Sequence, residues 1–137
     1  MSDWNTRIIE EFRENDGRVG GVFEGATLLL LHHTGRTSGT ERIAPLMYRR
    51  EGDRTFVFGS KGGADTHPDW YLNVMANPSV TYEAGTAIIE AEAVEVTGRE
   101  RDEIYARQSD DRPVFGEYQR GTDRTIPVIE LKSRPGA

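Results

Sequence analysis

The spacing of apolar residues near the start of the chain predicts a helix over residues 3–16. Trp4, Ile8 and Phe12 recur every four residues, which places them on one face of such a helix. A polar capping residue precedes this stripe, and a glycine follows the expected end. Residues 17–25 then hold four glycines in nine positions, which is typical of a hinge or loop. We therefore expect a helix and a glycine-rich hinge within residues 1–25.

The next apolar run, residues 27–34, has too few polar positions for one face to meet water. A strand of this kind is expected to be covered on both sides. Residues 42–50 and 55–59 predict two more strands, because each is bounded by turn residues. The connecting turns fall at residues 35–39 and 51–53 and are short enough for antiparallel pairing.

The middle of the chain predicts a short helix and a second hairpin. Proline and an Asn-Pro pair bound a helix over residues 68–76. Strands are expected over residues 80–83 and 86–96, joined by a tight turn. The apolar positions of the second strand change phase after Ala93, which predicts a β-bulge there.

The last third of the chain predicts two helices and a closing strand. A capping-box spacing starts a helix over residues 97–108. A shorter helix begins near Pro113 and ends before Gly121. Residues 126–131 form the last expected strand, in which Pro127 requires an edge or bulged position because it cannot donate a ladder hydrogen bond.

The order of these elements predicts an α+β fold built on an antiparallel β-barrel. Five to six strands occur without strand–helix–strand alternation, which argues against a parallel sheet. No repeat or linker divides the chain. We expect a single domain in which residues 26–137 form the barrel.

Composition excludes several classes of protein. The chain has 137 residues, with 36% hydrophobic and 29% charged residues, which is typical of a globular domain. It has no cysteine, so disulfides, thiolate metal sites and a cysteine nucleophile are excluded. A net charge of −6 argues against nucleic acid as a partner.

The sequence also argues against a membrane span, a leader and a metal site. No apolar run approaches the roughly 20 residues that a spanning helix needs, and no signal-peptide pattern is present. The cytoplasm is therefore the expected location. His32 and His33 are adjacent on a strand and point to opposite faces, so no metal site is expected.

Three segments carry groups suited to a ligand. Residues 35–42 combine glycines, hydroxyls and two arginines, and arginine contacts to phosphate are charge-assisted and often bidentate. Residues 59–63 place a lysine among three glycines, which let a ring or phosphate approach the backbone. Trp70 and Asn73 follow on the next helix. Each segment alone is also explained as an ordinary polar loop or a packed helix.

Taken in order, these segments and their neighbours resemble the deazaflavin-dependent nitroreductase family, which includes reductases of quinones and nitro compounds. The resemblance spans residues 27 to 131, and the order of the motifs is more specific than any one of them. The motifs are Gly35-Arg-Thr-Ser-Gly39 with Arg42 and Pro45-Leu46, Ser60-Lys-Gly-Gly63, Pro68-Asp-Trp-Tyr-Leu-Asn73, Asn77-Pro78 and Thr122-Asp-Arg-Thr-Ile-Pro127.

The resemblance implies a split β-barrel, similar to flavin reductases and other FMN-binding split barrels, that binds coenzyme F420. This coenzyme is a 5-deazaflavin with a phosphate and an oligoglutamate tail. The implied activity is hydride transfer from the reduced coenzyme to an organic acceptor. The implied phosphate contacts come from Arg36, Thr37, Ser38 and Arg42, contacts to the ring or its pocket from Ser60, Lys61, Asp69, Trp70 and Asn73, and further coenzyme contacts from Gly39, Pro45 and Gly59. Tyr118 and Ser60 are implied in placing and protonating the substrate.

Two positions depart from the family's pattern. Phe115 and Gly121 stand where some members carry aromatic hydroxyls or a larger ring, and a lost hydroxyl removes a proton source. Quinones and enones are therefore expected acceptors ahead of nitro compounds. Two alternatives stay open: an FMN-dependent reductase or oxidase of the same fold, and a non-catalytic F420 carrier.

The apolar stripe of the N-terminal helix has more than one interpretation. It is expected to pack on the barrel or on a second copy of the chain in a homodimer. Contact with the inner face of the membrane is the less favoured alternative, because the helix is too acidic for a typical anionic-membrane anchor.

Overall fold

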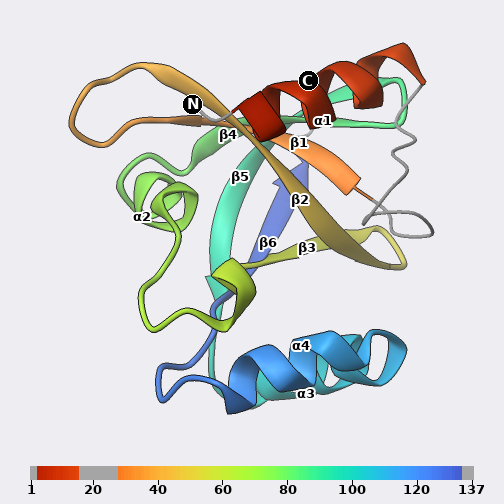
Figure 1. Ribbon diagram of the computed structural model, residues 1–137, viewed down its shortest axis with the longest axis vertical. Coiled ribbons are helices and arrows are strands. Elements are labelled where there is room, and N and C mark those ends of the chain that lie inside the picture. The colour runs from red at the N-terminus through yellow and green to blue at the C-terminus, as the bar shows by residue number, and fades with distance from the viewer. Residues whose placement is uncertain (1–2, 16–27, 134–137) are drawn as a thin grey trace.

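The structure is a computed structural model that describes residues 3–15 and 28–133, and it is built around a closed six-stranded antiparallel barrel (Figure 1). The helices lie outside the barrel wall. In chain order the elements are α1 (Asp3–Glu14), β1 (Leu28–Thr34), β2 (Glu41–Glu51), β3 (Arg54–Phe58), the 3-10 turn η2 (Lys61–Gly63), α2 (Asp69–Ala76), β4 (Ser79–Ala84), β5 (Ala87–Val96), α3 (Gly98–Asp111), α4 (Pro113–Arg120) and β6 (Val128–Ser133).

The strand order around the barrel is β1-β2-β3-β6-β5-β4, and β1 closes it by pairing with both β2 and β4. The consecutive strands β1–β2, β2–β3 and β4–β5 form hairpins, whereas β3 and β4 do not pair, and β6 from the chain end inserts between β3 and β5. The predicted α+β barrel is therefore confirmed, with six strands.

The apolar strand β1 is covered on both faces, as its sequence predicts. Leu29 and Leu31 point into the barrel, where they pack with residues of β3 to β6 and with Trp70 of α2. Leu28 and Leu30 point outward and pack beneath the apolar stripe of α1. Because both faces of β1 are buried, its sequence lacks the alternation of apolar and polar residues that is typical of a half-exposed strand.

A further apolar layer lies between the barrel and the pair α3 and α4. Phe58 of β3 meets the rings of Tyr105 and Phe115 edge-on, at centroid distances of 5.9 and 5.4 Å. Val96, at the end of β5, belongs to this layer, whereas Ala91 and Ala93 belong to the barrel interior.

This change of layer explains why the predicted bulge at Ala93 is wrong. The residues of β5 pair one to one with β4 and β6 throughout the described strand, with Ala93 opposite Leu131. The apolar phase changes because the outer face of the strand end is covered by helices. Pro127 precedes β6 instead of lying within it, so the closed barrel needs no edge for it.

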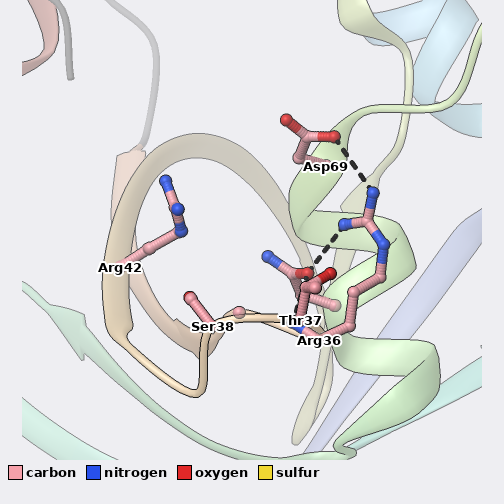
Figure 2. Close-up of a pocket in the computed structure, with 7 residues that line it drawn as sticks. Arg36, Thr37, Ser38, Arg42 and Asp69 are labelled. Atoms are coloured by element: carbon pink, nitrogen blue, oxygen red, sulfur yellow. Dashed lines mark hydrogen bonds and ion pairs between the residues drawn. The ribbon is translucent and has the colours of Figure 1, made fainter.

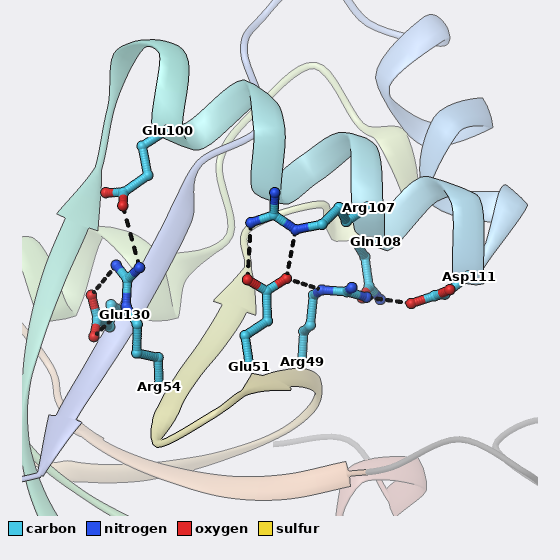
Figure 3. Close-up of polar contacts among 8 residues, drawn as sticks. All are labelled: Arg49, Glu51, Arg54, Glu100, Arg107, Gln108, Asp111 and Glu130. Atoms are coloured by element: carbon cyan, nitrogen blue, oxygen red, sulfur yellow. Dashed lines mark hydrogen bonds and ion pairs between the residues drawn. The ribbon is translucent and has the colours of Figure 1, made fainter.

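An ion-pair network fastens α3 to the β2–β3 hairpin (Figure 3). Glu51 accepts two hydrogen bonds from Arg107, both 2.9 Å long, and one of 2.6 Å from Arg49. Arg49 also reaches Asp111 at 2.6 Å. The hydrogen bonds from Arg107, followed by the one from Arg49, lower the pKa of Glu51 to about 2.

Thr97 stands at the N-cap of α3 as predicted, but its side chain makes no capping hydrogen bond. The glycine-rich hinge expected within residues 17–25 lies outside the described residues. None of the helices in the described part of the chain is long and apolar enough to cross a membrane.

Candidate functional site

The loop between β1 and β2 is a tight turn that requires its glycines. The amide of Gly39 donates to the carbonyl of Gly35, and Gly39 adopts a positive φ of 70° that disfavours other residues. The Ser38 hydroxyl folds back and accepts from the amide of Thr40 at 3.2 Å. A Cβ at Gly35 would lie 2.5 Å from that hydroxyl oxygen. The loop thus holds Arg36, Thr37 and Ser38 at its tip.

These residues line a polar cavity of about 200 Å³ (Figure 2). Arg36 and Arg42 stand on opposite sides of it. Arg36 forms a 3.5 Å ion pair with Asp69, whose side chain is 84% exposed. Within residues 3–15 and 28–133, the Arg42 guanidinium has no hydrogen-bond or ion-pair partner. The cavity is therefore equipped to bind an anion. Its lining is Gly35, Arg36, Thr37, Ser38, Arg42, Asp69 and Asn73.

A second, larger cavity of about 550 Å³ shares Arg42 and Asp69 with the polar one. Its exposed lining is mainly apolar, and Trp70 forms part of the wall. The helix α1 contributes Ile9, which the sequence did not mark as a site residue. A cavity with an apolar wall beside an anion site suits an amphiphilic ligand. The remaining lining comes from His33, Thr40, Glu41, Ile43 and Ala44.

The glycine-rich loop after β3 lies on the other flank of α2. Gly59 donates its amide to the Pro127 carbonyl, and a Cβ at Gly59 would lie 2.7 Å from the Pro127 ring. Packing therefore explains this glycine. Lys61 has a positive φ of 46°, and its ammonium donates to the Thr66 hydroxyl at 3.1 Å.

Arg124 holds this loop in place, and no sequence reasoning singled it out. Its guanidinium donates to the carbonyls of Gly59, Ser60 and Ala64 at 3.1, 2.8 and 2.7 Å. It also donates to Nδ1 of His67 at 3.0 Å. Burial lowers the pKa of Arg124, and burial followed by the Arg124 charge lowers the pKa of His67.

The same loop rests on α4, which carries Tyr118. A Cβ at Gly63 would lie 3.0 Å from the Tyr118 carbonyl oxygen, so only glycine fits there. The Tyr118 ring is half-buried and packs edge-on against Phe115 at 5.6 Å. Phe115 is 3% exposed and belongs to the layer under α4, and Gly121 follows the end of that helix.

The predicted site residues thus form two groups on either side of the start of α2. Arg36, Thr37, Ser38, Arg42, Asp69 and Asn73 share the polar cavity, which Trp70 adjoins. Gly59, Ser60, Lys61 and Tyr118 cluster around η2 and line neither cavity. A Cβ at Gly59 would lie 3.6 Å from the Pro68 ring, so the two groups meet at the first turn of α2.

Comparison with known proteins assigns the family. A model of the F420H(2)-dependent quinone reductase family matches residues 4–133. The chain belongs to this family. An F420H(2)-dependent quinone reductase of Mycobacterium tuberculosis (strain H37Rv) is 36% identical over 129 residues, which are 90% of this chain and 85% of the relative.

Two solved structures are also similar to this chain. One, described as an F420-H2 dependent reductase, is 38% identical, covers 77% of this chain and 93% of its own, and has a TM-score of 0.70. Another, described as a domain-swapped dimer, is 36% identical, covers 95% and 98%, and has a TM-score of 0.72.

Membership of the F420H(2)-dependent quinone reductase family confirms the resemblance, the enzyme class and F420 as the cofactor. The motifs do not predict which of their residues contact the protein itself. Asn73 is 2% exposed and hydrogen-bonded to Arg36 and His33, and Arg124 of the last motif holds the glycine-rich loop.

Proposed function

We propose that this protein reduces a quinone with hydride from F420H2, and that the two adjoining cavities form the active site. The observation that carries the proposal is their shared border. Arg42 and Asp69 line both the polar cavity and the larger apolar one. One ligand with a phosphate and a flat ring can therefore span them.

The residues of the polar cavity would hold the coenzyme's phosphate. Arg42 has no protein partner among the described residues, so binding an anion costs it no existing ion pair. Arg36 is fixed from behind, which presents its remaining donors to the cavity. The hydroxyls of Thr37 and Ser38 lie on the exposed loop tip and add neutral donors.

The ring would lie against Trp70 in the larger cavity. Ser60 and Lys61 line neither cavity, and they would contact only a part of the coenzyme that extends past the first turn of α2. When bound, reduced F420 supplies a hydride from its C5. The protein's part is to orient the ring, keep water from it and deliver a proton. Ile9 of α1 closes one side of the cavity. Tyr118 lies beside η2 and lines neither cavity, and its hydroxyl is the proposed proton donor to an acceptor bound on that side of α2.

Phe115 and Gly121 favour a quinone over a nitro compound as the acceptor. Phe115 is packed in the aromatic layer and offers no hydroxyl, and Gly121 offers no side chain. Of the three positions 115, 118 and 121, only Tyr118 carries a hydroxyl. Reduction of a quinone needs fewer proton deliveries than full reduction of a nitro group.

The test is anaerobic mixing of the protein with F420H2 and menadione, while the absorbance of the oxidised coenzyme is followed. Fluorescence titration of F420 gives the Kd in parallel. Arg42→Ala is expected to raise this Kd about 10- to 150-fold, because a hydrogen bond to a charged group contributes roughly 1.5–3 kcal/mol. Arg99→Ala removes a 93% exposed arginine of α3 and serves as the control.

Each outcome separates the alternatives. Binding of F420 without oxidation by any quinone, enone or nitroaromatic would favour the carrier. Copurified yellow flavin and no F420 binding would favour the FMN enzyme. Equal Kd values for wild type and Arg42→Ala would show that the phosphate lies elsewhere.

A homodimer also remains a proposal for this chain. It is supported by the solved relative described as a domain-swapped dimer, and light scattering after gel filtration would test it. Membrane contact through α1 stays a prediction as well. The apolar residues of α1 that the structure describes, Ile8, Ile9 and Phe12, are buried against the barrel, which leaves little of this face for lipid.

A further inference from the structure

The Asn73 side chain forms its hydrogen bonds within the protein. It is 2% exposed, and its Oδ1 accepts two hydrogen bonds from Arg36. The backbone amide of Arg36 donates at 3.0 Å, and the guanidinium Nη1 donates at 2.8 Å. Asn73 therefore fixes both the start of the anion-binding loop and the direction of the Arg36 side chain.

These two donors also determine the orientation of the amide. Both groups on Arg36 can only donate, so the Asn73 atom between them is the oxygen. The amide nitrogen of Asn73 then faces Nδ1 of His33, 3.0 Å away. An amide nitrogen can only donate, so Nδ1 of His33 accepts and the ring carries its proton on Nε2.

The surroundings of His33 keep its ring in this neutral form. The residue is 5% exposed, at the end of β1 under α2. Burial, followed by the nearby charge of Arg42, lowers the pKa of His33 to about 4. At neutral pH the ring is therefore uncharged, and its Nδ1 lone pair accepts the hydrogen bond from Asn73.

We propose that His33 is a positioning residue for coenzyme binding, acting through Asn73 to hold Arg36 in its anion-binding arrangement. The inference rests on the proposed function, in which the polar cavity binds the phosphate of F420. The chain of contacts runs from β1 through α2 to the loop tip. His33 is not among the lining residues of the polar cavity, although it forms part of the wall of the larger one, so a double substitution with Asn73 is needed to separate its effect through Asn73 from a direct contact.

Removal of the Nδ1 acceptor weakens the arrangement in two ways. The Asn73 amide loses the partner that distinguishes its nitrogen end from its oxygen end. A turned amide would then place its NH2 group against the two donors of Arg36, which repels them. The loop would sample arrangements in which Arg36 points away, and each binding event would have to restore it.

The experiment compares two substitutions of His33 by fluorescence titration with F420. His33→Phe keeps a flat ring but has no acceptor, and it is expected to raise the Kd about tenfold, as for the loss of one hydrogen bond. His33→Asn places a carbonyl oxygen at the position of Nδ1 and is expected to restore most of the affinity. His32→Phe, on the opposite face of β1, is the matched control and should leave the Kd unchanged.

A double substitution tests the route of the effect. In an Asn73→Ala background, His33→Phe should raise the Kd no further, because the intermediary is already absent. A full additional tenfold loss there would overturn the proposal, and so would equal Kd values for His33→Phe and the wild type. Melting temperatures of all variants identify any loss that comes from unfolding.

The tautomer can be checked on the unaltered protein without coenzyme. The chain has three histidines, so the ring nitrogen signals of a ¹⁵N-labelled sample can be assigned with the His33→Asn variant. The proposal expects an unprotonated Nδ1 for His33, and a proton there would refute it. Absence of any F420 binding by the wild type would instead reject the proposed function, and with it this role.

Discussion

Replacing Arg124 by lysine should loosen the glycine-rich loop without unfolding the barrel. Arg124 donates to three loop carbonyls and to His67, and all four contacts depend on the forked shape of the guanidinium. Lysine keeps the positive charge but offers a single ammonium, which cannot reach groups spread from residue 59 to residue 67. The substitution therefore tests whether the loop depends on the shape of the Arg124 guanidinium or only on its positive charge.

The expected size of the effect follows from the contacts. Four hydrogen bonds from a charged donor would contribute about 6 kcal/mol at roughly 1.5 kcal/mol each. The loop is half-exposed, so its freed carbonyls regain water and most of that amount is recovered. We expect about 2–3 kcal/mol of loop stability to be lost, which corresponds to about 30- to 150-fold more frequent opening.

Hydrogen exchange followed by mass spectrometry measures this opening directly. Amides within residues 60–66 should exchange faster in Arg124→Lys by that factor, while those of β1 and β4 stay protected. Turnover with menadione should fall in parallel, because Ser60 and Lys61 are carried by the loop. Arg99→Lys is the control. Unchanged exchange in residues 60–66 would show that Arg124 does not order this loop.

Two further substitutions address stability and proton delivery. Glu51→Gln should lower the free energy of unfolding at pH 7 by about 1–2 kcal/mol, a value reduced for solvent screening, whereas Glu103→Gln should change it by less than about 0.5 kcal/mol. Because the folded pKa of Glu51 is lowered to about 2, its contribution is full above the unfolded value of 4.5, and more than half of the difference should vanish in urea titrations at about pH 3. Tyr118→Phe should lower kcat with menadione about tenfold or more at unchanged KM for F420H2; an unchanged kcat at every pH would leave water as the proton source.

The strands and helices of this fold could be predicted closely because turn residues and apolar phase bound them. The two-sided burial of β1 followed directly from its run of four leucines. The predicted bulge at Ala93 failed for a physical reason. The phase of apolar residues reports which layers cover a strand, and a helix pair over one strand end produces the same change as an inserted residue.

The order of the strands around the barrel was less accessible than the strands themselves. Insertion of β6 between β3 and β5 joins segments about seventy residues apart, and periodicity carries no record of such pairing. The ion pairs from Arg49 and Arg107 to Glu51 depend on that arrangement. These ion pairs form because α3 packs over the β2–β3 hairpin, and the sequence pattern does not predict that packing.

In the candidate site, too, the sequence predicts which types of side chain are present but not which way they point. The motif containing Arg36 and Arg42 predicts an anion site from residue type alone, and the structure places both at one cavity. Their partners differ, however. Arg36 is held by Asn73 and Asp69, whereas Arg42 has no partner among the described residues. In the proposed site the two arginines of one motif therefore have different roles: Arg42 would pair with the anion, and Arg36 would be held in place before the anion binds. The identity of the residues that do the fixing, His33 and Asn73, depends on contacts between β1 and α2, which no local pattern encodes.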